Sequence, residues 1–318
     1  MKGTATVIKH TGSHYLLSEL PGWKLFPAVL RGKIRLGGST ATNPIAVGDV
    51  VDYECDSLPS AEAPAVITSI HERRNYIIRR STNLSRQNHV IAANIDQAVI
   101  ICTLWFPELK LPFLDRILVT CEVYGVRPVI VLNKVDLYRD EVPEEVAHFR
   151  EIYEGAGYTV LETSVKTGEG IEELRKLCGG RVSLFSGESG VGKSSMIKAL
   201  DPSLDPRTGE ISDAHLQGKH TTTFYEMFRF SSPDGESGCI IDTPGIRGFG
   251  LVDLEKEEIP LYFPEMLRAS AGCRFTPCTH THEPGCAVKK ALEDGSISPE
   301  RYNSYLGMIE DVGEGKYR

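Results

Sequence analysis

The order of two motifs along the chain constrains its fold more than any other feature of the sequence. Residues 187–194 read Gly-Glu-Ser-Gly-Val-Gly-Lys-Ser, which matches the phosphate-binding P-loop pattern G-x-x-x-x-G-K-[ST]. The tetrad Asn133-Lys134-Val135-Asp136 matches a guanine-reading motif, and residues 137–186 separate it from the P-loop that follows. In an ordinary small GTPase the tetrad comes after the P-loop. The simplest interpretation is a GTPase domain whose chain order has been rotated.

Composition places the chain among soluble globular proteins. Its 318 residues are 41% hydrophobic and 25% charged, and this length predicts two or three domains. The first residues lack an apolar core long enough for a secretory signal, and no segment approaches the roughly 20 apolar residues that span a bilayer. We therefore expect a cytoplasmic protein that binds neither membrane nor DNA, with a monomer as the default state.

The N-terminal part differs from the rest in charge and in pattern. Residues 1–89 hold 11 Lys and Arg against 7 Asp and Glu, so they carry +4 and the remainder carries −12 of the net −8. This asymmetry fits a nucleic-acid contact at one end, although chance fluctuation would also produce it. Short β-like runs broken by Gly and Pro predict a small barrel of OB or SH3-like type. These runs are residues 4–8, 15–19, 24–30, 47–54 and 65–70.

Between two of these runs lies a basic loop, residues 31–39, which is suited to contact a phosphate backbone or else is a solvated turn. A basic, polar stretch from 73 to 86 predicts a linker. Beyond it, apolar strand-like segments at 98–102, 128–132, 158–161 and 182–185 alternate with helical periodicity. The helical segments are 107–124, 144–155, 171–178 and 193–200. This alternation predicts a parallel sheet covered on both faces.

The P-loop is expected to bind phosphate through its backbone, because glycines let successive amides turn toward an anion at a helix N-terminus. Lys193 would reach the β- and γ-phosphates, and the Ser194 hydroxyl would bind Mg²⁺. The expected nucleotide contacts of this loop are Gly187, Glu188, Ser189, Gly190, Val191, Gly192, Lys193, Ser194 and Ser195.

Base choice is assigned to the tetrad. The Asp136 carboxylate can accept from the two guanine donors, N1–H and the 2-amino group, whereas adenine lacks that pair. The Lys134 stem would cover the base plane, and Asn133 would tie its loop to the P-loop. A second base loop is expected where such domains usually have Ser-Ala-Lys. Its residues here are Ser164, Val165 and Lys166.

Asp242-Thr243-Pro244-Gly245 follows an apolar strand-like run and matches D-x-x-G. Asp242 is expected to hold Mg²⁺, and the Gly245 amide to sense the γ-phosphate. A threonine between the P-loop helix and Asp242 should also bind Mg²⁺. We favour Thr222, with Thr221 and Thr223 as alternatives.

Hydrolysis needs an oriented water, together with the phosphate contact of Lys193 and the Mg²⁺ contact of Thr222. The position after the D-x-x-G glycine, where Ras-like enzymes have glutamine, is Ile246, which cannot orient water. His220 is the best candidate within the chain, although a surface or strand-packing histidine is an alternative interpretation. A group supplied by a partner would also serve.

Near the C-terminus, Cys273-x₄-Cys278-x-His280-x₅-Cys286 provides three thiolates and one imidazole. That set suits one structural, tetrahedral Zn²⁺ with no open position. His282 is a rival to His280 as the fourth ligand, and free buried cysteines are the alternative to a metal. The metal would hold together a segment otherwise too small to form a core. After it, residues 287–294 and 299–309 have helical patterns.

The combined motifs resemble one family closely, the RsgA (YjeQ) circularly permuted GTPases, over nearly the whole chain. The resemblance implies an α/β P-loop GTPase of rotated chain order at 85–250, an N-terminal all-β OB-type barrel at 1–80 that contacts RNA, and a C-terminal zinc-binding helical module at 251–318. It also implies binding to the 30S ribosomal subunit and its 16S rRNA. The expected activity is hydrolysis of GTP to GDP and phosphate, stimulated by the subunit during its late maturation.

The sequence is also compatible with three alternative functions. A metabolic P-loop enzyme such as a nucleotide kinase would need an acceptor pocket, and the tetrad at 133–136 and the cysteine cluster argue against it. A ribosome-binding module with little turnover stays open because of Ile246. A translation factor acting in elongation would differ only in which ribosomal particle stimulates it.

Overall fold

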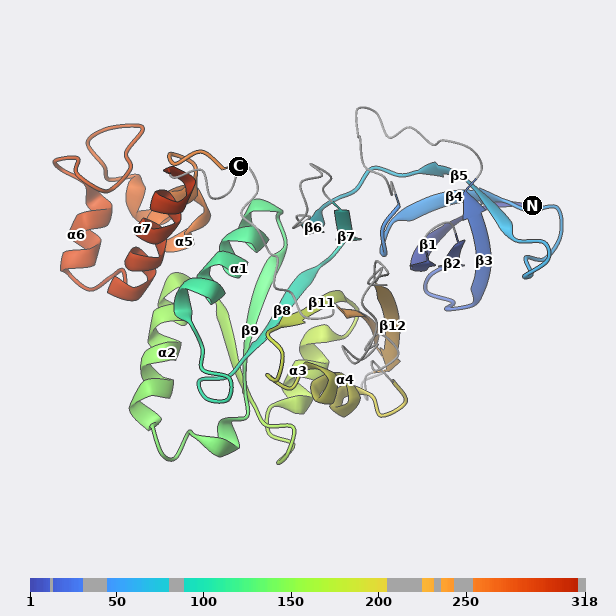
Figure 1. Ribbon diagram of the computed structural model, residues 1–318, viewed down its shortest axis with the longest axis horizontal. Coiled ribbons are helices and arrows are strands. Elements are labelled where there is room, and N and C mark those ends of the chain that lie inside the picture. Colours follow the sequence, from blue (N-terminus) through green and yellow to red (C-terminus); the bar gives the residue numbers. More distant parts are fainter. Residues whose placement is uncertain are drawn as a thin grey trace, which may run out of the picture. The chain divides into compact units, whose positions relative to one another are not determined.

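The computed structural model describes residues 1–11, 14–30, 45–79, 89–204, 225–231, 236–242 and 254–313 (Figure 1). The chain forms two compact units. The first contains residues 1–99, 171–187 and 193–246, and the second contains residues 100–170, 188–192 and 247–318. The chain therefore passes repeatedly from one unit to the other, and the P-loop itself is divided between them.

The N-terminal strands of the first unit form a closed barrel. They are β1 (Lys2–Thr11), β2 (His14–Ser18), β3 (Leu25–Leu30), β4 (Val50–Glu54) and β5 (Ala65–Ile70). β1 pairs with both β2 and β4, β2 pairs with β3, and β5 joins β3 to β4. The β3–β5 pair is parallel and the others are antiparallel. A five-stranded closure of this order is that of an OB barrel, as the family resemblance implies.

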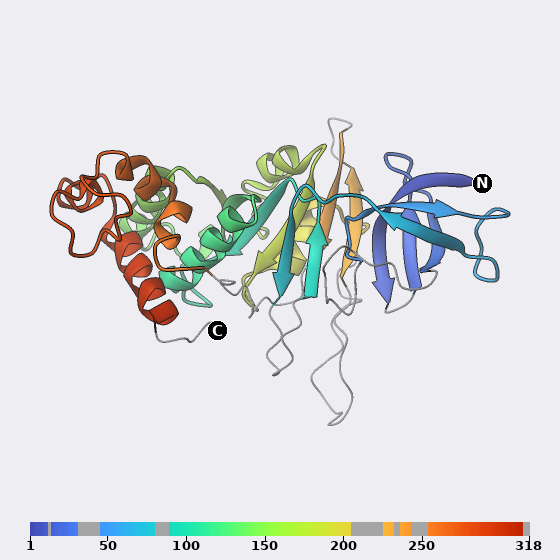
Figure 2. The same ribbon diagram turned by 90° about the horizontal axis from the view of Figure 1, so that it is seen from above.

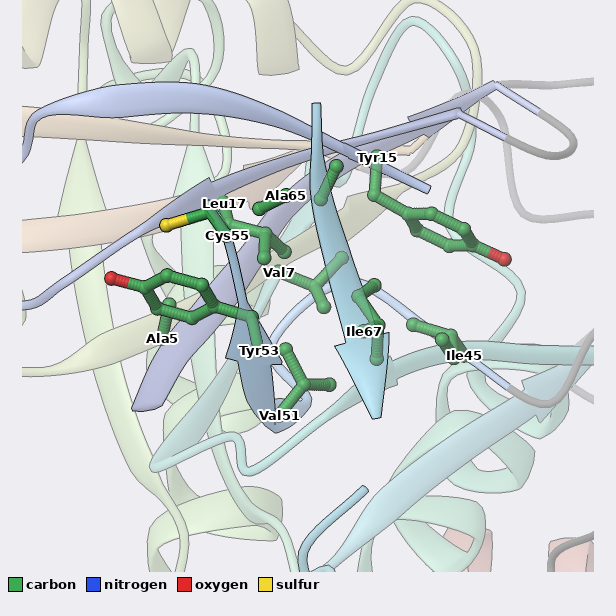
Figure 3. Packing of buried hydrophobic residues seen from close by; sticks show 11 residues of the cluster. Ala5, Val7, Tyr15, Leu17, Ile45, Val51, Tyr53, Cys55, Ala65 and Ile67 are labelled. Atoms are coloured by element: carbon green, nitrogen blue, oxygen red, sulfur yellow. The ribbon is translucent and has the colours of Figure 1, made fainter. Parts of the chain in front are cut away.

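Alternation along the strands fills the barrel. Because successive side chains of a strand point to opposite faces, every second residue of β4 is buried, and β1 alternates likewise up to Val7, where its pairing with β2 shifts register. Val7, Leu17, Val51 and Ile67 have no exposed surface, and their side chains point toward one another in the centre of the barrel (Figure 3). This apolar core explains why the short runs in the sequence, each too weak to stand alone, form one closed module.

The first unit continues into a second group of strands and two helices. The bounds of these elements are β6 (Tyr76–Arg79), β7 (His89–Ala93), α3 (Ile171–Cys178), β11 (Val182–Gly187), α4 (Lys193–Leu200), β12 (Glu226–Ser231) and β13 (Ser237–Asp242). β11 and β13 are parallel, β12 is antiparallel to β13, and β1 pairs with β12 at Lys9 and Glu226. The Lys9 ammonium lies 2.6 Å from the Glu226 carboxylate. The barrel strand β1 thus continues this sheet.

Part of the stretch expected as a linker is a strand instead. β6 pairs with β7, and the side chains of Ile77 and Ile78 are buried. Arginines make this segment polar overall, and its two isoleucines are adjacent, so the sequence shows no alternation of apolar and polar residues.

The second unit contains the strands that end at the predicted base-reading loops. β8 (Gln97–Cys102) begins in the first unit and ends in the second, where the strand order is β10 (Thr159–Thr163), β9 (Arg127–Asn133), β8. β9 and β10 are parallel. Every residue of β8 is buried, as expected for a parallel strand covered on both faces. The accompanying helical elements are α1 (Leu111–Val123), η1 (Val135–Leu137) and α2 (Pro143–Ala156).

Helix α1 begins four residues later than the periodicity predicts. Pro112 lies in its first turn, where a residue without a backbone N–H is tolerated, whereas further inside the helix it would remove a hydrogen bond. Residues 107–110 therefore lead into the helix without belonging to it.

The C-terminal part of the second unit is helical, with η3 (Ile259–Tyr262), α5 (Pro264–Ser270), α6 (Ala287–Glu293) and α7 (Pro299–Gly313). Figure 2 shows these helices, coloured orange to red, as one group. Their core includes Phe263, Met266 and Tyr305, and Val119 of α1 packs into the same cluster. The cysteine-rich segment is thus fixed against α1. Among the described residues, no helix combines the length and the apolar character that crossing a membrane requires.

Candidate nucleotide site and metal centre

Asn133 links three loops at the carboxyl end of β9. It is the last residue of the strand and 1% exposed. Its side-chain amide donates to the Val191 carbonyl at 2.8 Å, and its Oδ1 accepts from the Thr163 hydroxyl at 3.1 Å. One buried side chain therefore joins the tetrad to the P-loop and to the end of β10.

Gly192 makes this contact possible. Its φ is +97°, and a Cβ built at this position would lie 2.6 Å from the Asn133 amide nitrogen. Any other residue would be strained in this backbone conformation and would push the asparagine away. The glycine of the P-loop pattern is thus required here for packing against the tetrad as well as for the turn.

Lys134 lies across the P-loop. Its backbone is left-handed, with φ of +63°. The ammonium donates to the Gly190 carbonyl at 2.6 Å and to the Phe106 carbonyl at 2.8 Å. These two bonds fix the end of the side chain, so that its methylene stem is held beside the loop, as a base-covering role requires.

Asp136 faces the second predicted base loop. Its side chain is 12% exposed, accepts from the Ser164 hydroxyl at 2.6 Å, and lies 3.8 Å from the Lys166 ammonium. Ser164 is buried, Val165 is half-buried, and the Lys166 side chain is exposed. The tetrad and the Ser164–Lys166 segment, separate in the sequence, are therefore adjacent.

In the first unit, the parallel register of β11 and β13 positions the predicted metal-binding carboxylate. Phe185 lies opposite Asp242, so Asp242 lies near the end of β11 from which the P-loop continues. Asp242 pairs with the ammonium of Lys193, the first residue of α4, and the two side chains are 14% and 11% exposed. Ser194 is half-buried and Ser195 is exposed on the same helix. A carboxylate, an ammonium and a hydroxyl thus gather beside one helix N-terminus.

Residues 188–192 of the P-loop belong to the second unit. Val191 is buried, Glu188 is half-buried, and Ser189 and Gly190 are exposed. Gly187 ends β11 and is buried. The loop is one continuous segment of chain, so residues 188–192 are followed directly by Lys193 of the first unit.

Several further predicted positions lie outside the described residues. These are the basic loop at 31–39, His220, Thr222 with its alternatives Thr221 and Thr223, Gly245, and Ile246. Their assignments rest on the sequence.

Four side chains near the C-terminus form a metal-ligand cluster. The ligand atoms of Cys273, Cys278, His280 and Cys286 all lie within 4.8 Å of one another. The His280 Nδ1 is 3.3 Å from the Cys286 sulfur and 3.6 Å from the Cys273 sulfur. Three sulfurs and one imidazole nitrogen converging on one point fit the donor set of a structural Zn²⁺.

The rival ligand His282 is directed elsewhere. It is exposed, and its Nδ1 is 2.9 Å from the Thr281 hydroxyl. His280, in contrast, is 3% exposed, and burial lowers its pKa, which favours the neutral imidazole that binds metals. The Tyr302 hydroxyl donates to the His280 carbonyl at 2.7 Å, which fixes the backbone of this residue from α7.

Desolvation, with the neighbouring Cys286 and Cys273, raises the pKa of the Cys278 thiol to about 12. Deprotonated cysteines here would need a cation to offset their charge. The residues present therefore fit a bound Zn²⁺.

Comparison with known proteins decides the family. A model described as RsgA GTPase matches residues 70–252. The small ribosomal subunit biogenesis GTPase RsgA of Bacteroides fragilis is 48% identical over 318 residues, which cover 100% of this chain and 99% of that protein. The chain belongs to the RsgA GTPase family. The RsgA of Porphyromonas gingivalis is also similar, with 47% identity over 98% of both chains.

Solved structures agree with this assignment to the RsgA family. The crystal structure of YjeQ from Thermotoga maritima matches with a TM-score of 0.79 and 32% identity, covering 98% of this chain and 99% of that one. YloQ, described as a circularly permuted GTPase, matches with a TM-score of 0.75 and 27% identity over 100% and 97% of the two chains. The predicted fold class is confirmed, and as an RsgA GTPase the protein is a GTP hydrolase.

Sequence reasoning missed two groups in this RsgA site. Thr163 holds Asn133 through its hydroxyl, and its position directly before the Ser164–Lys166 segment was the available signal. The Phe106 carbonyl holds Lys134. A backbone carbonyl carries no side-chain signature, so no sequence pattern identifies it.

Proposed function

We propose that this GTPase binds the 30S ribosomal subunit and assists its late maturation, hydrolysing GTP to GDP and phosphate with stimulation by the subunit. The relatives from Bacteroides fragilis and Porphyromonas gingivalis, which match over 99% and 98% of their length, are named small ribosomal subunit biogenesis GTPases. The N-terminal OB barrel supports contact with 16S rRNA, because barrels of this type bind single-stranded nucleic acid. In this proposal the protein acts in the cytoplasm as a monomer.

Guanine binding rests on one observation above the others, the buried bond from the Asn133 amide to the Val191 carbonyl. It joins the tetrad to the P-loop although their sequence order is reversed. Asp136 accepts from the two guanine donors, Lys134 covers the base, and the segment 164–166 borders it. Residues 187–195 bind the phosphates through backbone amides, the Lys193 ammonium and the serine hydroxyls.

Magnesium would be held by Ser194 and Asp242, together with Thr222. When bound, the ion offsets charge on the phosphate oxygens. Lys193 contributes a fixed positive charge near the same groups, which lowers the barrier electrostatically. Gly245 senses the γ-phosphate, and His220 positions the attacking water.

The zinc would be structural. Cys273, Cys278, His280 and Cys286 leave no open position for a substrate. The metal would hold together a C-terminal module, residues 251–318, which follows the barrel domain at 1–80 and the permuted GTPase domain at 85–250 along the chain.

GTP would favour the docked state, and hydrolysis would release the protein. The chain leaves Asp242 and enters the C-terminal module within a few residues. A contact between the γ-phosphate and the Gly245 amide can therefore change how that module is held. A ligand shifts such an equilibrium only by its differential affinity for the two states. Equal 30S affinity with GDP and with a non-hydrolysable GTP analogue would contradict this part of the proposal.

Phosphate release tests the proposal directly. The full-length protein would be assayed with GTP and with ATP, alone and with purified 30S, 50S and 70S particles. We expect GTP hydrolysis that 30S particles stimulate more than the other two. Preference for ATP would favour a metabolic enzyme, and GTP binding without phosphate release would favour a binding module. Stronger stimulation by 70S particles would point to elongation instead.

A further inference from the structure

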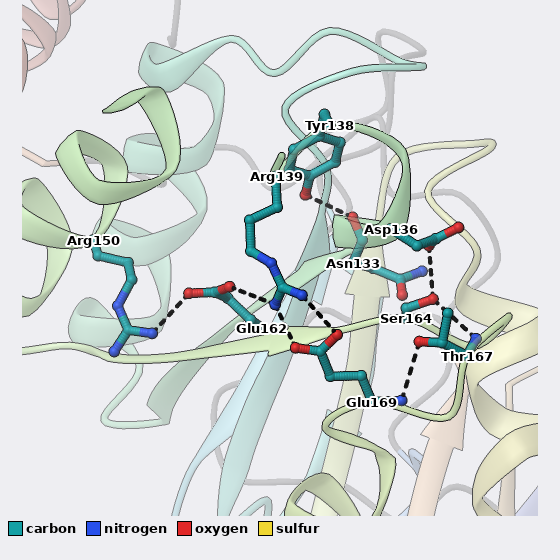
Figure 4. A network of polar contacts seen from close by, with 9 residues as sticks. All are labelled: Asn133, Asp136, Tyr138, Arg139, Arg150, Glu162, Ser164, Thr167 and Glu169. Atoms are coloured by element: carbon teal, nitrogen blue, oxygen red, sulfur yellow. Dashed lines mark hydrogen bonds and ion pairs between the residues drawn. The ribbon is translucent and has the colours of Figure 1, made fainter. Parts of the chain in front are cut away.

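The two base-reading loops are joined a second time, outside the predicted motifs. Arg139 lies three residues beyond Asp136, and both of its terminal nitrogens donate to the Glu169 carboxylate. The Nη2 bond measures 3.1 Å, and Nη1 also lies 3.5 Å from the Glu162 carboxylate. Figure 4 shows the arginine reaching from the tetrad side to the far end of the Ser164 loop. The contact is bidentate, which fixes direction as well as distance.

Glu169 closes the loop that it ends. Its carbonyl accepts from the Ser164 backbone N–H at 3.0 Å, and the Gly168 N–H donates to the Ser164 carbonyl at 2.8 Å. The Ser164 hydroxyl, which donates to Asp136, also accepts from the Thr167 N–H at 3.1 Å. A displacement of Glu169 is therefore transmitted to Ser164 through backbone and hydroxyl bonds alike.

The next residue limits how this loop can move. Gly170 has φ of +70°, and a Cβ there would lie 2.1 Å from the Glu162 carbonyl. The chain thus returns closely against β10 at this point. One end of the 164–169 loop therefore packs against β10. The contact between Arg139 and the Glu169 side chain then restrains the position of the remaining loop residues.

Arg139 is equally tied to the tetrad. Its backbone N–H donates to the Val135 carbonyl at 3.0 Å, so the residue completes the short turn that carries Asp136. The neighbouring Tyr138 hydroxyl donates to the Asn133 carbonyl at 2.8 Å and is buried with it. The backbone of Arg139 is therefore hydrogen-bonded directly to the tetrad.

We propose that the Arg139–Glu169 pair is a positioning pair that sets the distance between Asp136 and the Ser164–Lys166 segment, and with it the selectivity for guanine. This inference rests on the proposed binding of GTP. Neither residue touches the nucleotide in this scheme. The pair acts through the Ser164–Asp136 bond, whose two members border the base.

The expected effect is moderate, because both side chains are partly exposed, at 40% for Arg139 and 41% for Glu169. Exposed ion pairs contribute little to folding. Loss of the pair should therefore alter the ratio of affinities for guanine and adenine nucleotides more than it alters the stability of the protein.

Arg150 provides a matched control. Its side chain is also 40% exposed, and it donates to the same Glu162 at 2.8 Å from the opposite side, as Figure 4 shows. It pairs with Glu154 but makes no described bond to residues 164–169. A variant of Arg150 thus removes one arginine from the same carboxylate without releasing the base loop.

The experiment compares affinities of full-length protein for GDP, IDP and ADP by calorimetry, with melting temperatures measured in parallel. The variants are Arg139→Gln, Glu169→Gln, the double variant, and Arg150→Gln. We expect each of the first two to weaken GDP binding about fivefold, as a strong surface ion pair would. ADP binding should stay within twofold of wild type, and IDP, which lacks the 2-amino group, should lose less than GDP. The double variant should match either single one, because the two residues act as a unit.

Several outcomes would overturn the inference. One is that Arg139→Gln leaves the ratio of GDP affinity to ADP affinity unchanged. Another is that Arg150→Gln loses as much GDP affinity as Arg139→Gln does. A third is additive losses in the double variant, which would mean that the two residues act separately. A wild-type protein that binds GDP no better than ADP would contradict the proposed function instead, so the two failures are distinguishable.

Discussion

The Arg301 guanidinium donates to the Asp115 carboxylate at 2.7 Å, and both side chains are 1% exposed. The same guanidinium donates to Glu265 at 2.8 and 3.2 Å, and it lies 4.5 Å from the centre of the Phe263 ring. One side chain of α7 thus binds a residue of α1 and a residue of α5. This buried ion triad connects the C-terminal helices to the domain that carries the base-reading loops.

We expect Arg301→Met to destabilise the protein strongly. The methionine would fill much of the volume but would leave two carboxylates buried without a positive partner, which typically costs about 3–5 kcal/mol. Urea unfolding would measure the loss. Arg116→Met is the control, because Arg116 also joins α1 to α7, through Asp311, but at 24% and 20% exposure. It should cost no more than about 1 kcal/mol, and an equal loss in the two variants would contradict the role of burial.

The same variant should show a distinct pH dependence. Burial raises the pKa of Asp115, and Arg301 is the chief group that opposes this rise. Without Arg301, the pKa of Asp115 in the folded variant would lie further above its pKa in the unfolded chain. An acid whose folded pKa lies above its unfolded pKa loses stability as pH rises. The loss in free energy of unfolding caused by Arg301→Met should therefore be larger at pH 8 than at pH 5. A loss that becomes smaller as pH rises would contradict this explanation.

Asp136→Asn should change the preferred nucleotide from GTP to xanthosine triphosphate. The new amide can accept from N1–H but donates where the guanine 2-amino group also donates, whereas xanthine offers an oxygen there. We expect GTP hydrolysis efficiency to fall on the order of 100-fold or more, and hydrolysis of xanthosine triphosphate to appear. Phosphate release with both nucleotides measures this. Asp140→Asn, at an exposed position four residues on, should leave GTP hydrolysis unchanged. Retained GTP preference in Asp136→Asn would remove this residue from the base site.

The two histidines of the C-terminal segment should behave differently. His280→Ala removes a ligand from the cluster, so zinc content should fall and the melting temperature should drop, on the order of 10 °C. His282→Ala should change neither, because its ring bonds to Thr281 at the surface. Metal analysis by atomic emission, together with thermal unfolding of both variants, tests the pair. Zinc retained in His280→Ala but lost in His282→Ala would reverse the assignment.

His220→Ala addresses the hydrolytic water. Because Ile246 cannot orient water, we expect the alanine variant to lose most of its subunit-stimulated GTP hydrolysis, roughly 100-fold, as for other groups that assist proton transfer or orient water. GDP affinity should be unchanged. Single-turnover hydrolysis with 30S particles measures the effect. If basal and stimulated rates both equal those of the wild type, the water is positioned by another group.

The sequence predicts the chemistry of this protein better than the connections between its parts. The tetrad, the P-loop and the cysteine cluster were predictable because each pattern requires particular residue types at fixed spacing. The short β-like runs predicted a small barrel of OB or SH3-like type, and the OB type was implied only by the family resemblance. Choosing between them required the parallel pairing of β3 with β5, which is a long-range property.

Elements defined by tertiary contacts were not predictable. β6 is four residues long and flanked by arginines, so only the burial of Ile77 and Ile78 identifies it as a strand. Helix α5 and the Arg301 triad depend on residues far apart in the chain. A lone arginine in an amphipathic helix is usually exposed, and nothing local indicates that this one is buried.

The bond from Asn133 to Val191 also has a consequence for biosynthesis. The ribosome makes the tetrad first, and Val191 leaves the exit tunnel only after the intervening strand, helix and loop segments have followed. Until then the Asn133 amide lacks its acceptor, and the nascent chain has the guanine-binding tetrad without the phosphate-binding P-loop. A GTPase of ordinary motif order makes these parts in the opposite sequence. Nucleotide can therefore assist the folding of this domain only late in its translation.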